Sequence, residues 1–127
     1  MANTILIVDD SKLARIVAGR ATKALQPLWE RLEASNAEEA MAVFATRQVD
    51  VALLDYNMPG KNGLELAGEL RVTRPAMPIA LITANAQDEV IARARAVDVT
   101  FVTKPVTEEG LRDFIAAAAS RLRPEQK

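Results

Sequence analysis

Short apolar runs alternate with longer amphipathic segments along the chain, a pattern that predicts repeated strand and helix units. Four runs are almost uninterrupted, as expected for parallel strands that helices cover on both faces: residues 4–8, 51–54, 78–82 and 99–102. In residues 28–34, charged side chains interrupt the apolar ones, which favours a strand at an edge of the sheet. We therefore expect five strands, with the second at an edge.

The segments between these runs carry the signals of five helices. The first has an apolar stripe at helical spacing, of the kind that packs against a core, and Pro27 ends the segment. The stripe consists of Leu13, Ile16, Val17, Ala21 and Leu25. Residues 87–96 favour a fourth helix through their composition and spacing.

Three further helix starts are indicated by N-cap residues. Asn36 with Glu39, and Asn62 with Glu65, each have the spacing of a capping box. Thr107 is a suitable N-cap for the last helix. These positions complete an alternation of five strands with five helices.

Five such units within 127 residues indicate an α/β fold with one five-stranded parallel sheet, doubly wound as (βα)5. The flavodoxin-like strand order 2-1-3-4-5 is favoured, because it places the charged second strand at an edge. This order makes the first and third strands neighbours at the topological switch point, where such folds bind ligands. We expect one domain over residues 1–123 and a C-terminal tail of residues 124–127.

Polar residues follow four of the predicted strands. Asp9 and Asp10 follow the first, Asp55 the third, Thr83 the fourth and Lys104 the fifth. The carboxyl ends of parallel strands share one edge, with neighbours about 4.8 Å apart, so the three carboxylates should lie together and repel one another. A divalent cation relieves that repulsion, and Mg²⁺ suits a site built from oxygen ligands.

Asp55 is the candidate nucleophile because it is central, with Thr83 beside it and Lys104 within reach. Aspartate carboxylates can form acyl phosphates, and phosphoryl transfer requires mainly positioning and charge neutralisation, which Mg²⁺ and Lys104 would supply. The backbone carbonyl of Asn57 is a further candidate metal ligand. Each residue alone has an ordinary explanation, such as an N-cap or a solvated charge, but their joint placement at one edge favours a site.

Composition narrows the choice of function. The chain contains no cysteine and no histidine, which excludes disulfides and disfavours zinc. Its formal net charge of −1, with mixed signs along the chain, offers no basic surface for direct nucleic-acid or membrane binding. The N-terminal run lacks the features of a signal peptide, and nothing approaches membrane-spanning length, so we expect a cytoplasmic protein.

The same residues resemble a known family, the receiver domains of two-component response regulators, especially the chemotaxis-type single-domain members. The resemblance covers nearly the whole chain and rests on four motifs in order. They are Ile-Val-Asp-Asp-Ser at 7–11, Asp-Tyr-Asn-Met-Pro at 55–59 with Gly63 following, Thr83-Ala84, and Lys104-Pro105.

This resemblance implies a role for each polar residue of the predicted edge. Asp55 is similar to the family's phosphoacceptor, Asp9 and Asp10 to its Mg²⁺-binding pair, Lys104 to its phosphate partner and Thr83 to its switch hydroxyl. The implied donor is a phosphohistidine on a sensor histidine kinase or a histidine phosphotransfer protein. Such a domain is not an enzyme, although it assists its own Mg²⁺-dependent phosphorylation and slow dephosphorylation.

For several other positions, a role is implied by the resemblance alone. Pro105 corresponds to a cis-proline, and Phe101 to a switch aromatic that turns inward when the threonine moves. Asn57 and Asn85 occupy positions that influence how long the acyl phosphate survives. The chain departs from the family at residues 96–98, where Ala-Val-Asp replaces a Gly-Ala-Asp-like turn, and Val97 does not easily adopt positive φ.

Other functions fit parts of this pattern. A haloacid-dehalogenase-type phosphohydrolase also forms an aspartyl phosphate, but it needs a second aspartate where this chain has Asn57. A flavodoxin-like module would hold phosphate after the first strand, where Asp9 and Asp10 would repel it. A receiver-like protein-interaction domain that takes no phosphate would not need the acidic set.

We expect a two-state switch, in which phosphorylation of Asp55 moves Thr83 and Phe101 and alters a distant helix face. That face would act on a downstream protein target. The chain ends shortly after the last predicted helix, which fits either a stand-alone receiver or one part of a larger protein.

Overall fold

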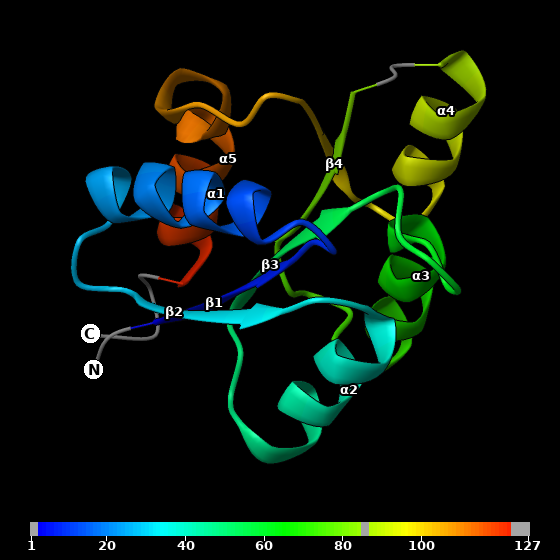
Figure 1. The fold of residues 1–127 in the computed structure, drawn as a ribbon, viewed down its shortest axis with the longest axis horizontal. Helices are drawn as coiled ribbons and strands as arrows, with labels where there is room; N and C mark the ends of the chain where they lie inside the picture. Colours follow the sequence, from blue (N-terminus) through cyan, green and yellow to red (C-terminus); the bar gives the residue numbers. More distant parts are fainter. Residues whose placement is uncertain (1–2, 85–86, 123–127) are drawn as a thin grey trace.

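In a computed structural model of the chain, which describes residues 3–84 and 87–122, five parallel strands form one sheet. Their order, β2-β1-β3-β4-β5, is the predicted one, with the charged β2 at an edge (Figure 1). The strands are β1 (Thr4–Val8), β2 (Glu30–Ala34), β3 (Val51–Asp55), β4 (Ile79–Thr83) and β5 (Thr100–Thr103). The predicted second strand was too long at its start: β2 begins at Glu30, and the Leu28 side chain before it is exposed.

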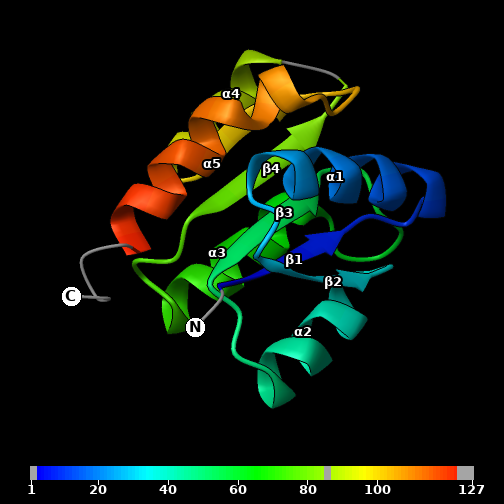
Figure 2. The ribbon, with the colours of Figure 1, turned by 90° about the vertical axis from the view of Figure 1, so that its left-hand side faces the viewer.

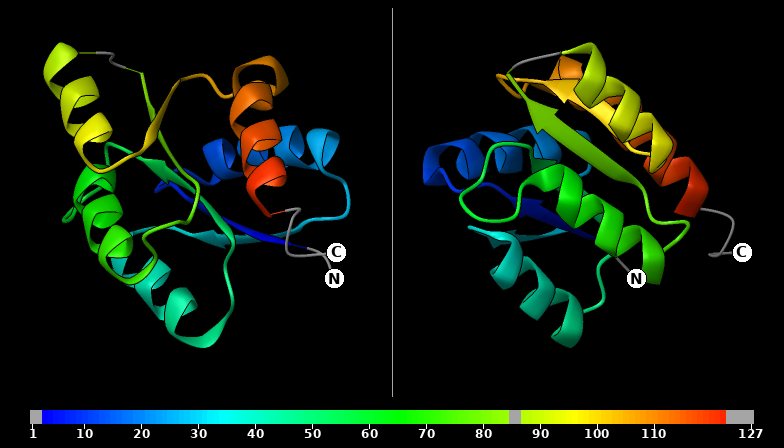
Figure 3. Two further views of the ribbon diagram at one scale, coloured as in Figure 1. Left: turned by 180° about the vertical axis from the view of Figure 1, so that it is seen from behind. Right: turned by 90° about the vertical axis from the view of Figure 1, so that its right-hand side faces the viewer.

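Helices cover both faces of the sheet, which confirms the doubly wound α/β fold. The helices are α1 (Lys12–Leu25), α2 (Ala37–Thr46), α3 (Gly63–Thr73), α4 (Asp88–Ala96) and α5 (Glu108–Leu122). Figures 1 and 3 show α1 and α5 on one face, and α2, α3 and α4 on the other. Within the described residues, no helix is long and apolar enough to cross a membrane.

The sheet separates two apolar clusters, one under each helix layer. Along β1, Leu6 and Val8 belong to the cluster under α2, α3 and α4, whereas Ile5 and Ile7 belong to the cluster under α1 and α5. This alternation follows from the two-residue period of a strand. All residues of β1, β3 and β4 are buried, which explains why these strands read as uninterrupted apolar runs.

The first helix packs through a face that matches only the C-terminal part of the predicted apolar stripe. Leu13 is 69% exposed, and Ile16 and Val17 are each 38% exposed. The buried residues of α1 are Ala18, Ala21 and Thr22, of which Ala21 belongs to the predicted stripe. Leu25, also of the stripe, is partly buried against the same cluster as Ala21. Small side chains allow α1 to lie close to α5, its neighbour on the same face (Figure 2).

The N-caps largely follow the predictions. Asn62 and Glu65 form a complete capping box, and the Thr107 hydroxyl accepts a hydrogen bond of 2.9 Å from the Gly110 N–H. Asn36 accepts a bond from the Glu39 N–H, but the Glu39 carboxylate accepts from Ser35 rather than from the Asn36 N–H. Asn36 and Glu39 therefore do not form a complete capping box.

The turn between α4 and β5 avoids positive φ at the valine. Val97 has φ −107°, and Asp98 takes the left-handed conformation with φ 56°. An aspartate tolerates this conformation far better than a β-branched residue. The Arg71 guanidinium donates hydrogen bonds to the carbonyls of both residues, which ties the turn to the end of α3.

Gly63 begins α3 where the backbone passes close to the end of β3. A Cβ at Gly63 would lie 2.2 Å from the Asp55 carbonyl oxygen, whereas a Cβ at Gly68, in the same helix, would meet nothing within 4 Å. We expect Gly63→Ala to lower the free energy of unfolding by about 2 kcal/mol or more through overpacking. Gly68→Ala should raise it by about 0.5–1 kcal/mol, because alanine favours the helix.

Urea denaturation followed by the fluorescence of Trp29 checks both variants, since this tryptophan is buried in the α1 and α5 cluster. Wild-type stability in Gly63→Ala would contradict the close approach of α3 to the end of β3.

Candidate functional site

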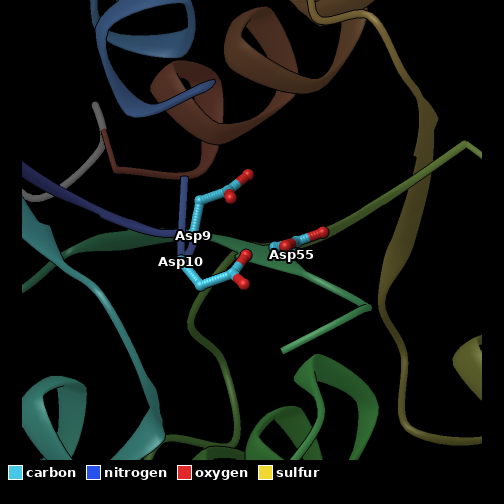
Figure 4. A group of neighbouring side chains, drawn as sticks. All are labelled: Asp9, Asp10 and Asp55. Atoms are coloured by element: carbon cyan, nitrogen blue, oxygen red, sulfur yellow. The ribbon is translucent and has the colours of Figure 1, made fainter. Parts of the chain in front are cut away.

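Three carboxylates meet at the carboxyl edge of the sheet, as predicted. Asp9 and Asp10 directly follow β1, and Asp55 ends the neighbouring β3, with Val8 paired to Leu54 in the ladder. One carboxylate oxygen from each aspartate lies within 4.8 Å of the others. Figure 4 shows the three side chains turned toward a common space from the ends of the two strands.

The three aspartates differ in their contact with solvent. Asp9 is 5% exposed and Asp55 is 2% exposed, whereas Asp10 lies at the surface. The Asp9 Oδ1 accepts a hydrogen bond of 2.9 Å from the Ser11 N–H, and its own N–H donates to the Ala34 carbonyl at 3.1 Å. Ser11, rather than Asp10, caps α1. Asp9 is therefore held by two hydrogen bonds, and Asp10 is the exposed member of the cluster.

Lys104 brings a single ammonium group to this cluster. Its Nζ lies 3.1 Å from Asp55 Oδ1 and 3.3 Å from Asp9 Oδ2. Its backbone N–H donates to the Thr83 carbonyl at 2.9 Å, which places the lysine, directly after β5, beside the end of β4. The Lys104–Pro105 peptide bond is cis, as the sequence resemblance implies.

Burial of Asp55 dominates the electrostatics of the site. Removal from water raises the pKa of Asp55 to about 6, the Asp9 charge adds to the rise, and Lys104 and the Asn57 N–H oppose it. Burial alone would lower the pKa of Lys104, but its hydrogen bond to Asp55 and the nearby carboxylates raise that pKa above its ordinary value. The attraction of one ammonium therefore does not offset the desolvation of Asp55.

The donor set suits a hard divalent cation. Three carboxylates face one ammonium, and the chain has no histidine or cysteine to provide nitrogen or sulfur. Such an all-oxygen site with excess negative charge fits Mg²⁺ better than zinc. The Asn57 carbonyl stays a predicted ligand; the residue itself is exposed in the loop after β3.

The two predicted switch residues lie near this site on neighbouring strands. Thr83 ends β4, is 1% exposed and pairs with Thr103, the residue before Lys104. Phe101 is half-buried and packs against the cluster under α2, α3 and α4. Asn85 and the predicted tail, residues 124–127, lie outside the described residues.

Sequence reasoning missed Arg15, which contacts from α1 the segment of Asp9 and Asp10, here called the acidic loop. Its Nη1 donates to the Asp9 carbonyl at 2.7 Å, and its Nε lies 2.8 Å from a Glu33 carboxylate oxygen. The available signal was its position in the first turn of a helix, where a cation is disfavoured by the helix dipole unless something else holds it there.

The fold and this site agree with a comparison against known families. A family model described as the response regulator receiver domain matches residues 5–116. The chain therefore belongs to the response regulator receiver domain family of two-component systems. Members of this class are signalling phosphoacceptors rather than classical enzymes.

Relatives and solved structures support the same assignment. The chain is 32% identical to the phosphate regulon transcriptional regulatory protein PhoB of Pseudomonas aeruginosa, covering 98% of this chain and 55% of that protein. It is 37% identical to the positive alginate biosynthesis regulatory protein of the same organism, covering 91% and 46%. The chain thus spans about half the length of these curated relatives.

Among solved structures, the chemotaxis protein CheY4 of Vibrio cholerae superposes with a TM-score of 0.83 at 26% identity, covering 93% of this chain and 99% of that one. The signal receiver domain of a modulated diguanylate cyclase from Desulfovibrio desulfuricans G20 gives 0.81 at 28% identity, covering 98% and 99%.

The raised pKa of Asp55 predicts a pH-dependent stability. The folded state holds the proton of the Asp55 carboxyl more tightly than the unfolded chain does. The free energy of unfolding should therefore fall as the pH rises from about 4 to about 6, and should stay low at higher pH. We expect Asp55→Asn to raise the free energy of unfolding by about 1–3 kcal/mol near pH 7.5 without Mg²⁺.

Urea denaturation across this pH range measures the difference in free energy of unfolding between Asp55→Asn and the wild type. This difference should shrink as the pH falls below about 6. Asp113→Asn, at an exposed position on α5, is the matched control and should show no such trend. A pH-independent difference for Asp55→Asn would contradict the raised pKa.

Proposed function

We propose that this receiver domain takes a phosphoryl group onto Asp55 from a phosphohistidine on a sensor histidine kinase or a histidine phosphotransfer protein. The observation that carries the proposal is the gathering of three carboxylates within 4.8 Å, with the Lys104 ammonium 3.1 Å from Asp55. Asp9, Asp10, Asp55 and the Asn57 carbonyl would hold Mg²⁺. Bound there, the ion would offset the charge on the phosphoryl oxygens.

The transfer makes one bond and breaks one. An Asp55 carboxylate oxygen attacks phosphorus, and the phosphorus–nitrogen bond of the donor breaks. The imidazole nitrogen keeps the electron pair and is then protonated by solvent. Lys104 donates to the phosphoryl oxygens, and its attraction for Asp55 keeps the nucleophile oriented before transfer. The domain thereby assists its own phosphorylation.

The resulting acyl phosphate would act on Thr83 and Phe101. A doubly charged group beside Thr83 offers strong acceptor oxygens to its hydroxyl. Movement of Thr83 along β4 would open space near Phe101 on β5, which pairs with Leu81. Shifting a 1:99 population to 99:1 requires about 5.5 kcal/mol of differential stabilisation. Contacts of the charged phosphoryl group with Lys104 and Thr83 together would supply it. The altered face would act on a downstream protein.

The donor would approach beside α1. Asp55 itself is buried, and next to Lys104 lies an open hollow of about 360 Å³ with a mostly apolar lining. Leu13 and Val17 of α1 and Pro105 form part of that lining. A protein that presents a phosphohistidine could cover these exposed apolar groups while its phosphoryl group reaches Asp55.

Incubation with acetyl phosphate and Mg²⁺ tests the phosphoacceptor. We expect one base-labile phosphoryl group per chain, detected by intact-protein mass spectrometry, and none in Asp55→Asn. Lys104→Ala should slow the reaction about 100-fold, as for loss of one preorganised charged donor. Rapid turnover of small phosphoesters would indicate a phosphohydrolase instead. If the wild type takes no phosphoryl group, the result would indicate a receiver-like protein-interaction domain.

Substitution of Leu13 separates docking from chemistry. With a histidine kinase that phosphorylates the wild-type chain, we expect Leu13→Ser to slow transfer about 10-fold through loss of an apolar anchor. Phosphorylation by acetyl phosphate should not change, because the small donor needs no docking surface. Leu28→Ser is the matched control, since Leu28 is 84% exposed and does not line the hollow. Equal slowing with both donors would contradict a docking role.

A further inference from the structure

Arg15 is held between the acidic loop and the edge strand. Its Nη1 donates a 2.7 Å hydrogen bond to the Asp9 carbonyl, and its Nε donates a 2.8 Å bond to the Glu33 carboxylate on β2. Only 15% of the arginine side chain is exposed, compared with 51% of the Glu33 side chain. Hydrogen bonds from a charged donor are stronger than those between neutral groups, so the guanidinium is fixed at both ends.

The bond to Asp9 acts on the peptide that joins two proposed metal ligands. The Asp9 carbonyl oxygen lies in the same rigid plane as the Asp10 nitrogen, so fixing one fixes the other. Asp9 is further restrained through its N–H and its side chain, which bond to Ala34 and Ser11. Asp10 is exposed, and the direction of its side chain therefore depends on the backbone that Arg15 holds.

We propose that Arg15 is a positioning residue for the magnesium site, holding the Asp9–Asp10 peptide in the orientation that binds the ion. The inference rests on the Mg²⁺ site of the proposed function. Arg15 is not a ligand, because a guanidinium has no acceptor to offer a metal. Its effect is that of an outer partner, which orients the groups in contact with the ion.

Charge and positioning make opposite predictions for this residue. A cation beside the acidic cluster repels Mg²⁺, so if charge alone mattered, removal of Arg15 would tighten metal binding. If the arginine orients the acidic pair, its removal weakens binding although no ligand is lost. The sign of the change therefore distinguishes the two roles.

An Mg²⁺ titration of the folded protein, followed by two-dimensional NMR of the backbone amides around the acidic loop, provides the test. We expect Arg15→Ala to raise the dissociation constant about 10-fold, as for loss of other outer-shell partners. Arg15→Lys should also weaken binding, because it keeps the charge but lacks the planar fork that reaches both partners. Arg20→Ala, at an exposed arginine of the same helix, is the matched control and should bind as the wild type.

Thermal unfolding without Mg²⁺ is measured in parallel, and titrations are made well below each midpoint, so that a loss of stability alone does not change the dissociation constant. If Arg15→Ala does not fold, Arg15→Lys and Glu33→Gln decide the matter. Glu33→Gln removes the charge that anchors Nε, and we expect it to weaken binding about twofold to fivefold.

Unchanged or tighter binding in Arg15→Ala, or wild-type binding in Arg15→Lys, would overturn the positioning role. Failure of the proposed function would give a different result. The wild type would then bind no Mg²⁺ at this site, and Asp55→Asn would leave the titration unchanged.

Discussion

The crowding of carboxylates at one edge of the sheet is the constraint on which this protein depends. Parallel strands end side by side, so Asp9 and Asp10 after β1 necessarily meet Asp55 at the end of β3. One ammonium, from Lys104, does not compensate for the burial of Asp55, whose pKa is raised to about 6. The site therefore holds unfavourable charge that a divalent cation would relieve, which is the physical basis of the proposed metal binding.

The remainder of the fold keeps the site in this unfavourable state. Two apolar clusters hold β1, β3 and β4 between helix layers, so the strand ends cannot move apart to relieve the repulsion. Gly63 lets α3 start against the Asp55 carbonyl, and Arg15 links the acidic loop to β2. Rigidity around the carboxylates and exposure at Asp10 together suit the proposed function, in which the site would bind an ion and admit a donor.

The surface around the site divides into regions with different properties. On the α1 side, exposed apolar residues such as Leu13 adjoin the hollow beside Lys104. On the β4 and β5 side, Thr83 and Phe101 connect the carboxyl edge to the packing under α4. In the proposed function, the first region receives the donor and the second carries the response. The turn that follows α4 is tied to α3 by Arg71, which restricts how that helix layer can move.

The sequence by itself determined the strands, their order and the carboxylate edge. Buried strands need apolar residues on both faces, the charged β2 can lie only at an edge, and polar residues directly after strands must share one side of the sheet. Only the tertiary structure decided that Ala18 is buried on α1 while Leu13 is exposed, because periodicity shows where apolar residues lie but not how closely α5 approaches. The contact of Arg15 with the Asp9 carbonyl likewise depends on how a helix sits over a loop, a relation between distant backbones that no local pattern encodes.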